Sequence, residues 1–126
     1  METIIIVTTT DVTIEKFIDM LPDSFRKEKQ LDGRYFISSE IHYCWIEYDD
    51  EIESYYDEDE MLIVKKHIPK PKFFTCEFTE IEFGKKILSH LISDNQFVID
   101  NDHGELLTGE EFIKRLKDDP DWDWRI

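Results

Sequence analysis

The sequence has few of the residues that mark a disulfide-rich, glycine-rich or basic protein. Its 126 residues include two cysteines, four glycines and four prolines, too few for a disulfide scaffold or a low-complexity chain. Basic residues are half as many as acidic ones: the chain has 15 Lys and Arg residues and 30 Asp and Glu residues, which gives a formal net charge of -15. Such a surface repels nucleic acids and anionic membranes. We therefore expect binding to neither, and a partner of positive charge.

Long apolar runs and catalytic motifs are also lacking. The apolar run at residues 4–7 is too short for a signal sequence, Glu2 stands where such a sequence carries a base, and no run approaches the roughly 18 residues of a membrane span. The four histidines share no zinc-binding spacing, and there is no nucleophile elbow, P-loop or dinucleotide fingerprint. We therefore expect a cytoplasmic protein that is not an enzyme and has no catalytic residues, metal or cofactor.

The composition nevertheless predicts a packed core. Hydrophobic residues make up 40% of the chain and aromatic residues 13%, too much for a disordered acidic chain. The length fits one domain, residues 1–126. Cys44 and Cys76 both fall inside strand-like segments. We expect them to be buried core thiols, with a disulfide or a metal pair as the alternative.

Apolar periodicity predicts the order β-α-β-β-(β)-β-α-β-α. Residues 14, 17, 18 and 21 are apolar at helical spacing, and Thr13 is the expected N-cap. Gly84 is a mild weakness in the second helix. The fold class is α+β: a single sheet of about five mostly antiparallel strands, with two or three helices packed mainly on one face. The predicted strands are residues 2–10, 34–38, 42–48, 61–64, 73–81 and 97–99, and the predicted helices are residues 14–21, 82–93 and 109–119.

The last helix has the clearest start signal in the chain. Thr108 and Glu111 form a capping box, with Leu107 and Phe112 at the two positions of a hydrophobic staple. Two tryptophans, at positions 122 and 124, follow the proline that ends this helix. We expect their rings to lock the helix onto the sheet; the alternative is an exposed aromatic pair in a contact surface.

The strongest feature of the sequence is an acidic run at residues 47–60, which contains no base. We expect it to be an exposed loop or strand extension. It can be a solvated loop, a docking surface for a basic protein, or a weak metal site without the glycine of an EF-hand loop. The expected partner-binding residues are its nine carboxylates and three tyrosines: Glu47, Tyr48, Asp49, Asp50, Glu51, Glu53, Tyr55, Tyr56, Asp57, Glu58, Asp59 and Glu60.

A second candidate is the segment DNDHG at residues 100–104. A divalent metal held by Asp100, Asp102 and His103 is conceivable. Asn, Asp and Gly also form tight turns in which side chains bond to their own backbone, and we favour that interpretation.

The C-terminal quarter resembles a known class of proteins. Its pattern is FVID at residues 97–100, Asp102-x-Gly104, the box TGEEF at residues 108–112 and PDWDW at residues 120–124. This pattern resembles the C-terminal ends of small acidic bacterial immunity proteins of polymorphic or contact-dependent toxin systems. The resemblance implies a non-enzymatic inhibitor that covers the cationic surface of a toxin, such as a basic nuclease.

Our leading hypothesis is therefore an acidic binding protein of the immunity type, whose partner is a basic toxin domain. The alternatives are a small metal-dependent enzyme that uses the turn at residues 100–104, and a phage or plasmid accessory protein that mimics nucleic acid. The sequence gives no indication of the oligomeric state.

Overall fold

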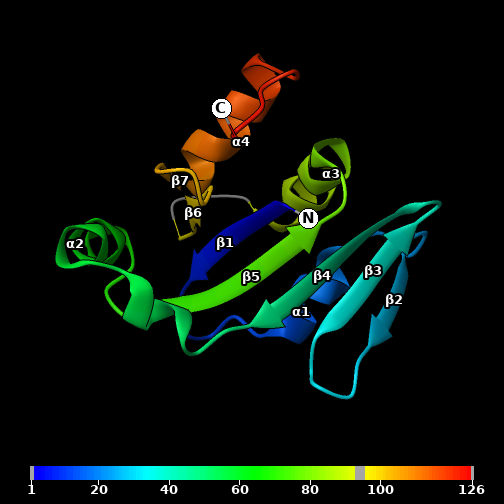
Figure 1. The fold of residues 1–126 in the computed structure, drawn as a ribbon, viewed down its shortest axis with the longest axis horizontal. Coiled ribbons are helices and arrows are strands. Elements are labelled where there is room, and N and C mark those ends of the chain that lie inside the picture. Colours follow the sequence, from blue (N-terminus) through cyan, green and yellow to red (C-terminus); the bar gives the residue numbers. More distant parts are fainter. Residues whose placement is uncertain (1, 93–95, 126) are drawn as a thin grey trace.

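The structure is a computed structural model that describes residues 2–92 and 96–125. It is an α+β fold with one antiparallel sheet in the order β2-β3-β4-β5-β1-β6-β7 (Figure 1). The strands are β1 (Glu2–Thr8), β2 (Arg26–Lys29), β3 (Tyr35–Ser39), β4 (His42–Tyr48), β5 (Lys72–Phe78), β6 (Val98–Asp100) and β7 (Leu106–Thr108). The helices are α1 (Ile14–Met20), the 3-10 helix η1 (Ile52–Tyr55), α2 (Glu58–His67), α3 (Ile81–Leu91) and α4 (Gly109–Asp118).

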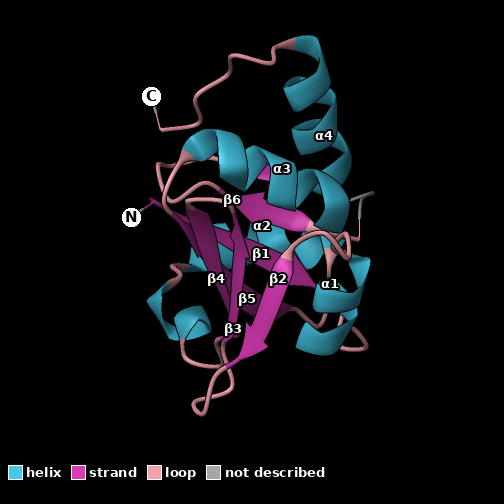
Figure 2. Ribbon diagram, turned by 90° about the vertical axis from the view of Figure 1, so that its right-hand side faces the viewer, coloured by secondary structure: helices cyan, strands magenta, loops and turns pink. Residues whose placement is uncertain are grey.

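β1 lies between β5 and β6 in the middle of the sheet. Its apolar run Ile4, Ile5, Ile6 and Val7 is at most 5% exposed. A run without alternation is expected where both faces of a strand are covered. One face carries α1, α3, α4 and the C-terminal tail, and the other carries α2. Viewed from the side in Figure 2, α1 lies to one side of the strands, and α3 and α4 lie above them.

The two faces bury cores of different size. The larger cluster joins alternate residues of β1, β3, β4 and β5 to α1, α3, α4 and the tail, and includes Phe17, Phe74 and Phe112. The smaller cluster lies under α2 at one end of the sheet: Ile5, Val7, Val64, Ile68, Phe73 and Val98. The helices are thus mainly on one face, as predicted.

Within the described residues the sheet is larger than predicted, with seven strands rather than about five, and there are four α-helices rather than two or three. The predicted strand at residues 61–64 is wrong, because these residues belong to α2. The sequence analysis missed β2 and β7. β2 is the charged edge strand RKEK, and edge strands carry charges that prevent pairing with other chains. β7 is a three-residue strand at the other edge.

The predicted starts of α1 and α4 are confirmed. The Thr13 side chain accepts a hydrogen bond from the Lys16 amide at the start of α1. At α4, the Glu111 amide donates to Thr108 Oγ1, and the Glu111 side chain accepts from the Thr108 amide. Strand β4 also has its predicted bounds. The predicted second helix is present as α3, although its last predicted residue, Ser93, lies outside the described residues.

Gly84 has a packing role on α3. A Cβ atom at this position would lie 2.9 Å from Cδ2 and Cε2 of Phe78. The missing side chain therefore lets α3 approach β5 closely, which explains a residue that otherwise weakens a helix.

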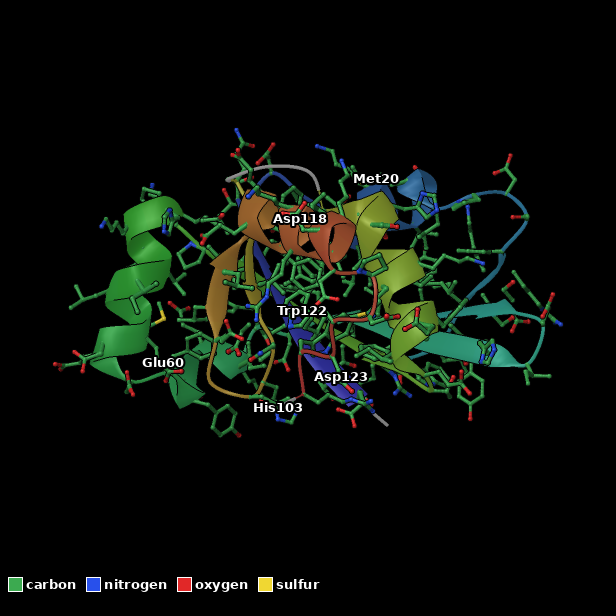
Figure 3. All side chains as sticks on the ribbon, turned by 90° about the horizontal axis from the view of Figure 1, so that it is seen from above. Met20, Glu60, His103, Asp118, Trp122 and Asp123 are labelled. Carbon is green, nitrogen blue, oxygen red and sulfur yellow. The ribbon has the colours of Figure 1, made fainter. Side chains whose placement is uncertain are left out.

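The tail prediction is also confirmed. Trp122 is 5% exposed and Trp124 1%, and both rings pack on Phe112 with centroid distances of 5.5 and 5.6 Å. Asn101 Nδ2 donates to the Trp124 carbonyl at 3.0 Å, which ties the tail to the turn after β6. Figure 3 shows Trp122 beside α4 and over the middle of the molecule.

Cys44 and Cys76 are buried core thiols, as expected. Both are fully buried, and their Sγ atoms lie 3.2 Å apart. The contact between the thiols, together with burial, holds the pKa of Cys44 well above its usual value. These cysteines are packed thiols rather than reactive ones. No helix of the described residues has the length and apolar character needed to cross a membrane.

Candidate binding surface

The acidic run is partly helical, which corrects the prediction of a loop or strand extension. Glu47 and Tyr48 end β4, and η1 follows at Ile52–Tyr55. Asp49 organises the connection, because its Oδ1 atom accepts hydrogen bonds from the amides of Glu51 (3.0 Å) and Ile52 (3.1 Å). One carboxylate of the run therefore holds the local backbone.

A second capping box starts α2. The Glu60 amide donates to Asp57 Oδ1 at 2.8 Å, and the Asp57 amide donates to Glu60 Oε1 at 3.1 Å. Carboxylates in the first turn and bases in the last turn, Lys65 to His67, complement the helix dipole. The spacing of Asp57 and Glu60 was the sequence signal for this helix. It was missed because the following residues MLIV resemble a strand.

Tyr56 connects the run to the turn after β6. Its hydroxyl donates to Asp100 Oδ2 at 2.6 Å, and its ring meets Phe73 edge-on at 5.3 Å. Burial and the bond to the Asp100 carboxylate raise the pKa of Tyr56 far above its usual value. Tyr56 therefore has a folding role, and a docking surface does not need it.

Glu47 lies beside Arg34, with 3.8 Å between Oε2 and the guanidinium Nε. Burial raises the pKa of Glu47, and the neighbouring Arg34 charge acts in the opposite direction. The pKa of Glu47 rises overall because its partial removal from water has a larger effect than its attraction to Arg34 across 3.8 Å.

Six of the nine carboxylates are exposed and form no ion pair with any described residue. Five of these six, all except the helix cap Asp57, also make no side-chain hydrogen bond within the described residues. Two tyrosines are exposed with them, Tyr48 (52%) and Tyr55 (80%). Leu62 (70%) and Ile63 (46%) on α2 add apolar surface that the sequence analysis missed by placing them in a strand. We call this set the acidic end: Tyr48, Asp50, Glu51, Glu53, Tyr55, Glu58, Asp59, Leu62 and Ile63.

The acidic end projects from one end of the sheet. In Figure 1, α2 lies at the left, away from α1, α3 and α4. Figure 3 shows Glu60 at the outer edge of the molecule. Exposed apolar side chains next to unpaired carboxylates are typical of an interface that combines contact area with electrostatic steering.

The turn at residues 100–104 forms as expected, with side chains bonded to their own backbone. Asp100 Oδ1 accepts from the Asp102 amide at 2.8 Å, and Asn101 Oδ1 accepts from the amides of His103 (2.8 Å) and Glu105 (3.0 Å). Asp102 and Gly104 both have positive φ, 61° and 96°, a conformation that Asn, Asp and Gly tolerate best.

Asp100 and Asp102 of this turn line a groove of about 390 Å³ together with Glu60, Ile63 and Leu106. His103 is directed elsewhere, since its Nε2 atom lies 3.8 Å from Glu2 Oε2. Within the described residues, no group of three or more His, Cys, Asp or Glu side chains is arranged to hold a metal ion.

Comparisons with known proteins do not extend these observations. No protein-family model, curated protein or solved structure matches this chain. The resemblance to immunity proteins therefore remains a prediction from the sequence, and the functional argument depends on the surface itself.

Proposed function

We propose that this protein is a cytoplasmic, non-enzymatic inhibitor of the immunity type, which binds a cationic bacterial toxin domain through its acidic end. The observation that carries the proposal is that carboxylates without an ion pair lie next to exposed side chains with large apolar surface, such as Tyr55 on η1 and Leu62 on α2. The carboxylates accelerate encounter with a basic surface, and the apolar groups provide the contact area.

We propose that only part of the predicted set of binding residues meets the partner. Asp49, Asp57 and Glu60 hold the backbone of η1 and α2, and Tyr56 holds Asp100. The other exposed carboxylates, Asp50, Glu51, Glu53, Glu58 and Asp59, make none of these bonds, so they are the ones free to meet a partner. The most informative among them are Asp50, Glu51 and Glu53, because none of them lies in the first turn of α2.

The test begins with the gene immediately upstream of this chain's gene, which we expect to encode a secreted protein with a basic C-terminal domain. The two proteins are produced together, and affinity and toxin activity are measured. We expect the triple variant Asp50→Asn, Glu51→Gln, Glu53→Gln to weaken binding about tenfold at low salt, which corresponds to roughly 0.5 kcal/mol for each charge. The affinity of the unchanged protein should fall with salt.

The matched control removes the same number of charges elsewhere. Asp19, Asp119 and Asp121 are exposed and lie outside the acidic end, so changing them to Asn should leave the affinity nearly unchanged. Equal weakening by both triple variants would indicate attraction by net charge alone and would contradict a defined docking surface. The absence of any basic domain beside the gene, or of any binding to it, would overturn the proposal.

Two further outcomes would favour the alternatives. Release of the partner by competing DNA would indicate a mimic of nucleic acid. Calorimetric titration with calcium, magnesium, manganese and zinc tests the enzyme hypothesis. A stoichiometric site of about micromolar affinity, abolished by Asp102→Asn, would favour a metal-dependent enzyme.

A further inference from the structure

Part of the sheet has an aromatic face that belongs to neither core cluster. Phe36 on β3 lies directly opposite Trp45 on β4, and Tyr43 follows two residues away. The Phe36 ring centroid is 4.7 Å from that of Trp45 and 5.5 Å from that of Tyr43. None of the three rings packs against either core cluster. The alternate residues, such as Cys44, face the large core and are fully buried.

No helix of the described residues lies across these rings. Figure 1 looks onto this side of the sheet, where β3 and β4 are drawn in front of α1. On the same side, α2 covers only the far end, over β1, β5 and β6. We call the uncovered part the open face; it consists of Phe36, Tyr43 and Trp45 with their cross-strand neighbours Glu28 and Glu77 and the neighbouring Glu47.

Carboxylates surround the aromatic strip. Glu77 on β5 lies opposite Trp45, and Glu28 on β2 lies opposite Phe36. Glu47 follows two residues after Trp45, on the same face of β4. Opposite Glu47, the Thr75 hydroxyl is buried and has no hydrogen-bond partner among the described residues. The open face therefore offers ring surfaces and negative charge, whereas the Thr75 hydroxyl is buried beneath it.

The protein already places two guanidinium groups on this surface. Arg26 on β2 pairs with Glu28, with 2.9 Å between Nη2 and Oε1, and Arg34 stacks on Trp45. The Arg34 guanidinium carbon lies 4.7 Å from the Trp45 ring centroid. Its Nε atom lies 2.8 Å from Asp32 Oδ2 and 3.8 Å from Glu47 Oε2. A planar guanidinium stacks on an aromatic ring and pairs with carboxylates at the same time, which an ammonium group does less well. The intramolecular contact therefore shows which chemistry the open face accepts.

We propose that the open face binds arginine side chains of the cationic partner, with guanidinium groups on the aromatic strip and pairing to Glu28, Glu47 and Glu77. This inference rests on the proposed function, because it takes a cationic protein as the partner. β4 leads from Trp45 through Glu47 directly into the acidic run, so the open face and the acidic end form neighbouring parts of one docking surface.

Two peptides of equal charge, hexa-arginine and hexa-lysine, test the inference. Their affinities for the complete protein are measured by calorimetry at one low salt concentration. We expect hexa-arginine to bind about fivefold more tightly, as one cation–π contact at an exposed site implies. The variant Trp45→Leu should abolish this difference. Met20→Ser, which changes an exposed apolar residue on α1, should preserve it.

A second measurement does not depend on a variant. In NMR spectra of the unchanged protein, added hexa-arginine should shift the indole N–H signal of Trp45. The indole N–H signals of the buried Trp122 and Trp124 should stay in place. Circular dichroism checks that Trp45→Leu folds.

The outcomes separate the two proposals. Suppose that both peptides bind with equal affinity and that the triple variant of Asp50, Glu51 and Glu53 weakens this binding. That result would overturn the role of the open face and leave the acidic end as the binding surface. An arginine preference that survives Trp45→Leu, or an unmoved Trp45 signal, would also overturn it. Failure of both peptides to bind would remove the support for a cationic partner and, with it, this inference.

Discussion

The two faces of the sheet are formed by the same strands but carry different kinds of side chains. On β4, Cys44 and Ile46 enter the large core, whereas Tyr43 and Trp45 remain on the open face. The covered face meets three helices and two buried tryptophans, while the other face has one helix at its end. Antiparallel sheets commonly leave one face to solvent. Here that face carries large aromatic side chains where polar ones would suffice, and our proposal for the open face is based on this difference.

The strongest test of this comparison replaces one tryptophan on each face. Trp124→Ala should lower the free energy of unfolding by about 3–5 kcal/mol, because it leaves a cavity beside Phe78 and Phe112. Trp45→Ala removes a partly exposed ring and its contacts with Arg34 and Phe36, so we expect a loss of about 1–2 kcal/mol. Chemical denaturation measures both. Similar losses would show that the open face is part of the folding core.

A second test adds volume to the covered face. Alanine normally stabilises a helix relative to glycine by about 1 kcal/mol. Gly84→Ala should instead lower the free energy of unfolding by about 1–3 kcal/mol, because the new methyl group would meet the Phe78 ring at 2.9 Å. Lys86→Ala on the exposed side of the same helix is the control and should stay within about 0.5 kcal/mol. A stabilised Gly84→Ala protein would mean that α3 is not held tightly against β5.

The third test concerns the smaller cluster under α2. Tyr56→Phe removes the hydroxyl that donates to Asp100, so the buried carboxylate loses a hydrogen bond. We expect a loss of about 1–3 kcal/mol, since bonds to charged groups are the stronger ones. Tyr55→Phe, at an exposed ring one residue away, should have no measurable effect in the same thermal or chemical melt. Equal results for the two tyrosines would contradict the bond.

The smallest effects should come from the two capping boxes, one on each side of the sheet. Thr108→Ala and Asp57→Ala should each cost about 0.5–2 kcal/mol. Asp57→Asn keeps the cap and removes only the charge, so it should cost much less than Asp57→Ala in chemical denaturation. If the two Asp57 variants are equally destabilised, the charge of the helix start matters more than the hydrogen bond to Glu60.

The parts of the fold that could be predicted are those with an unambiguous period or cap. Helical spacing after Thr13 and the box at Thr108 gave the starts of α1 and α4, and alternation gave β4. Residues 61–64 were assigned wrongly because four apolar residues fit a short strand as well as a helix. The cap at Asp57 and Glu60 would have decided the question, but the carboxylates were treated only as surface charge.

The proposed binding surface was predictable only in outline. The sequence pointed to the acidic run, yet nothing in it separates Tyr55, which is exposed, from Tyr56, which bonds to Asp100 from 44 positions away. The open face was not predicted either. Alternation showed Tyr43 and Trp45 on one side of β4, but only the placement of α2 at the far end reveals that no helix covers them.

The attachment of α2 has a consequence for the local stability of this helix and for the substitutions that it tolerates. This helix is joined to the sheet through a cluster of six buried residues and the Tyr56–Asp100 bond, so it should open locally at a lower energetic cost than the strands beneath the large core. Amide hydrogens of α2 should therefore exchange with solvent sooner than those of β1 or β5. As part of the proposed binding surface, a helix anchored in this way can accumulate substitutions while the rest of the domain keeps its structure.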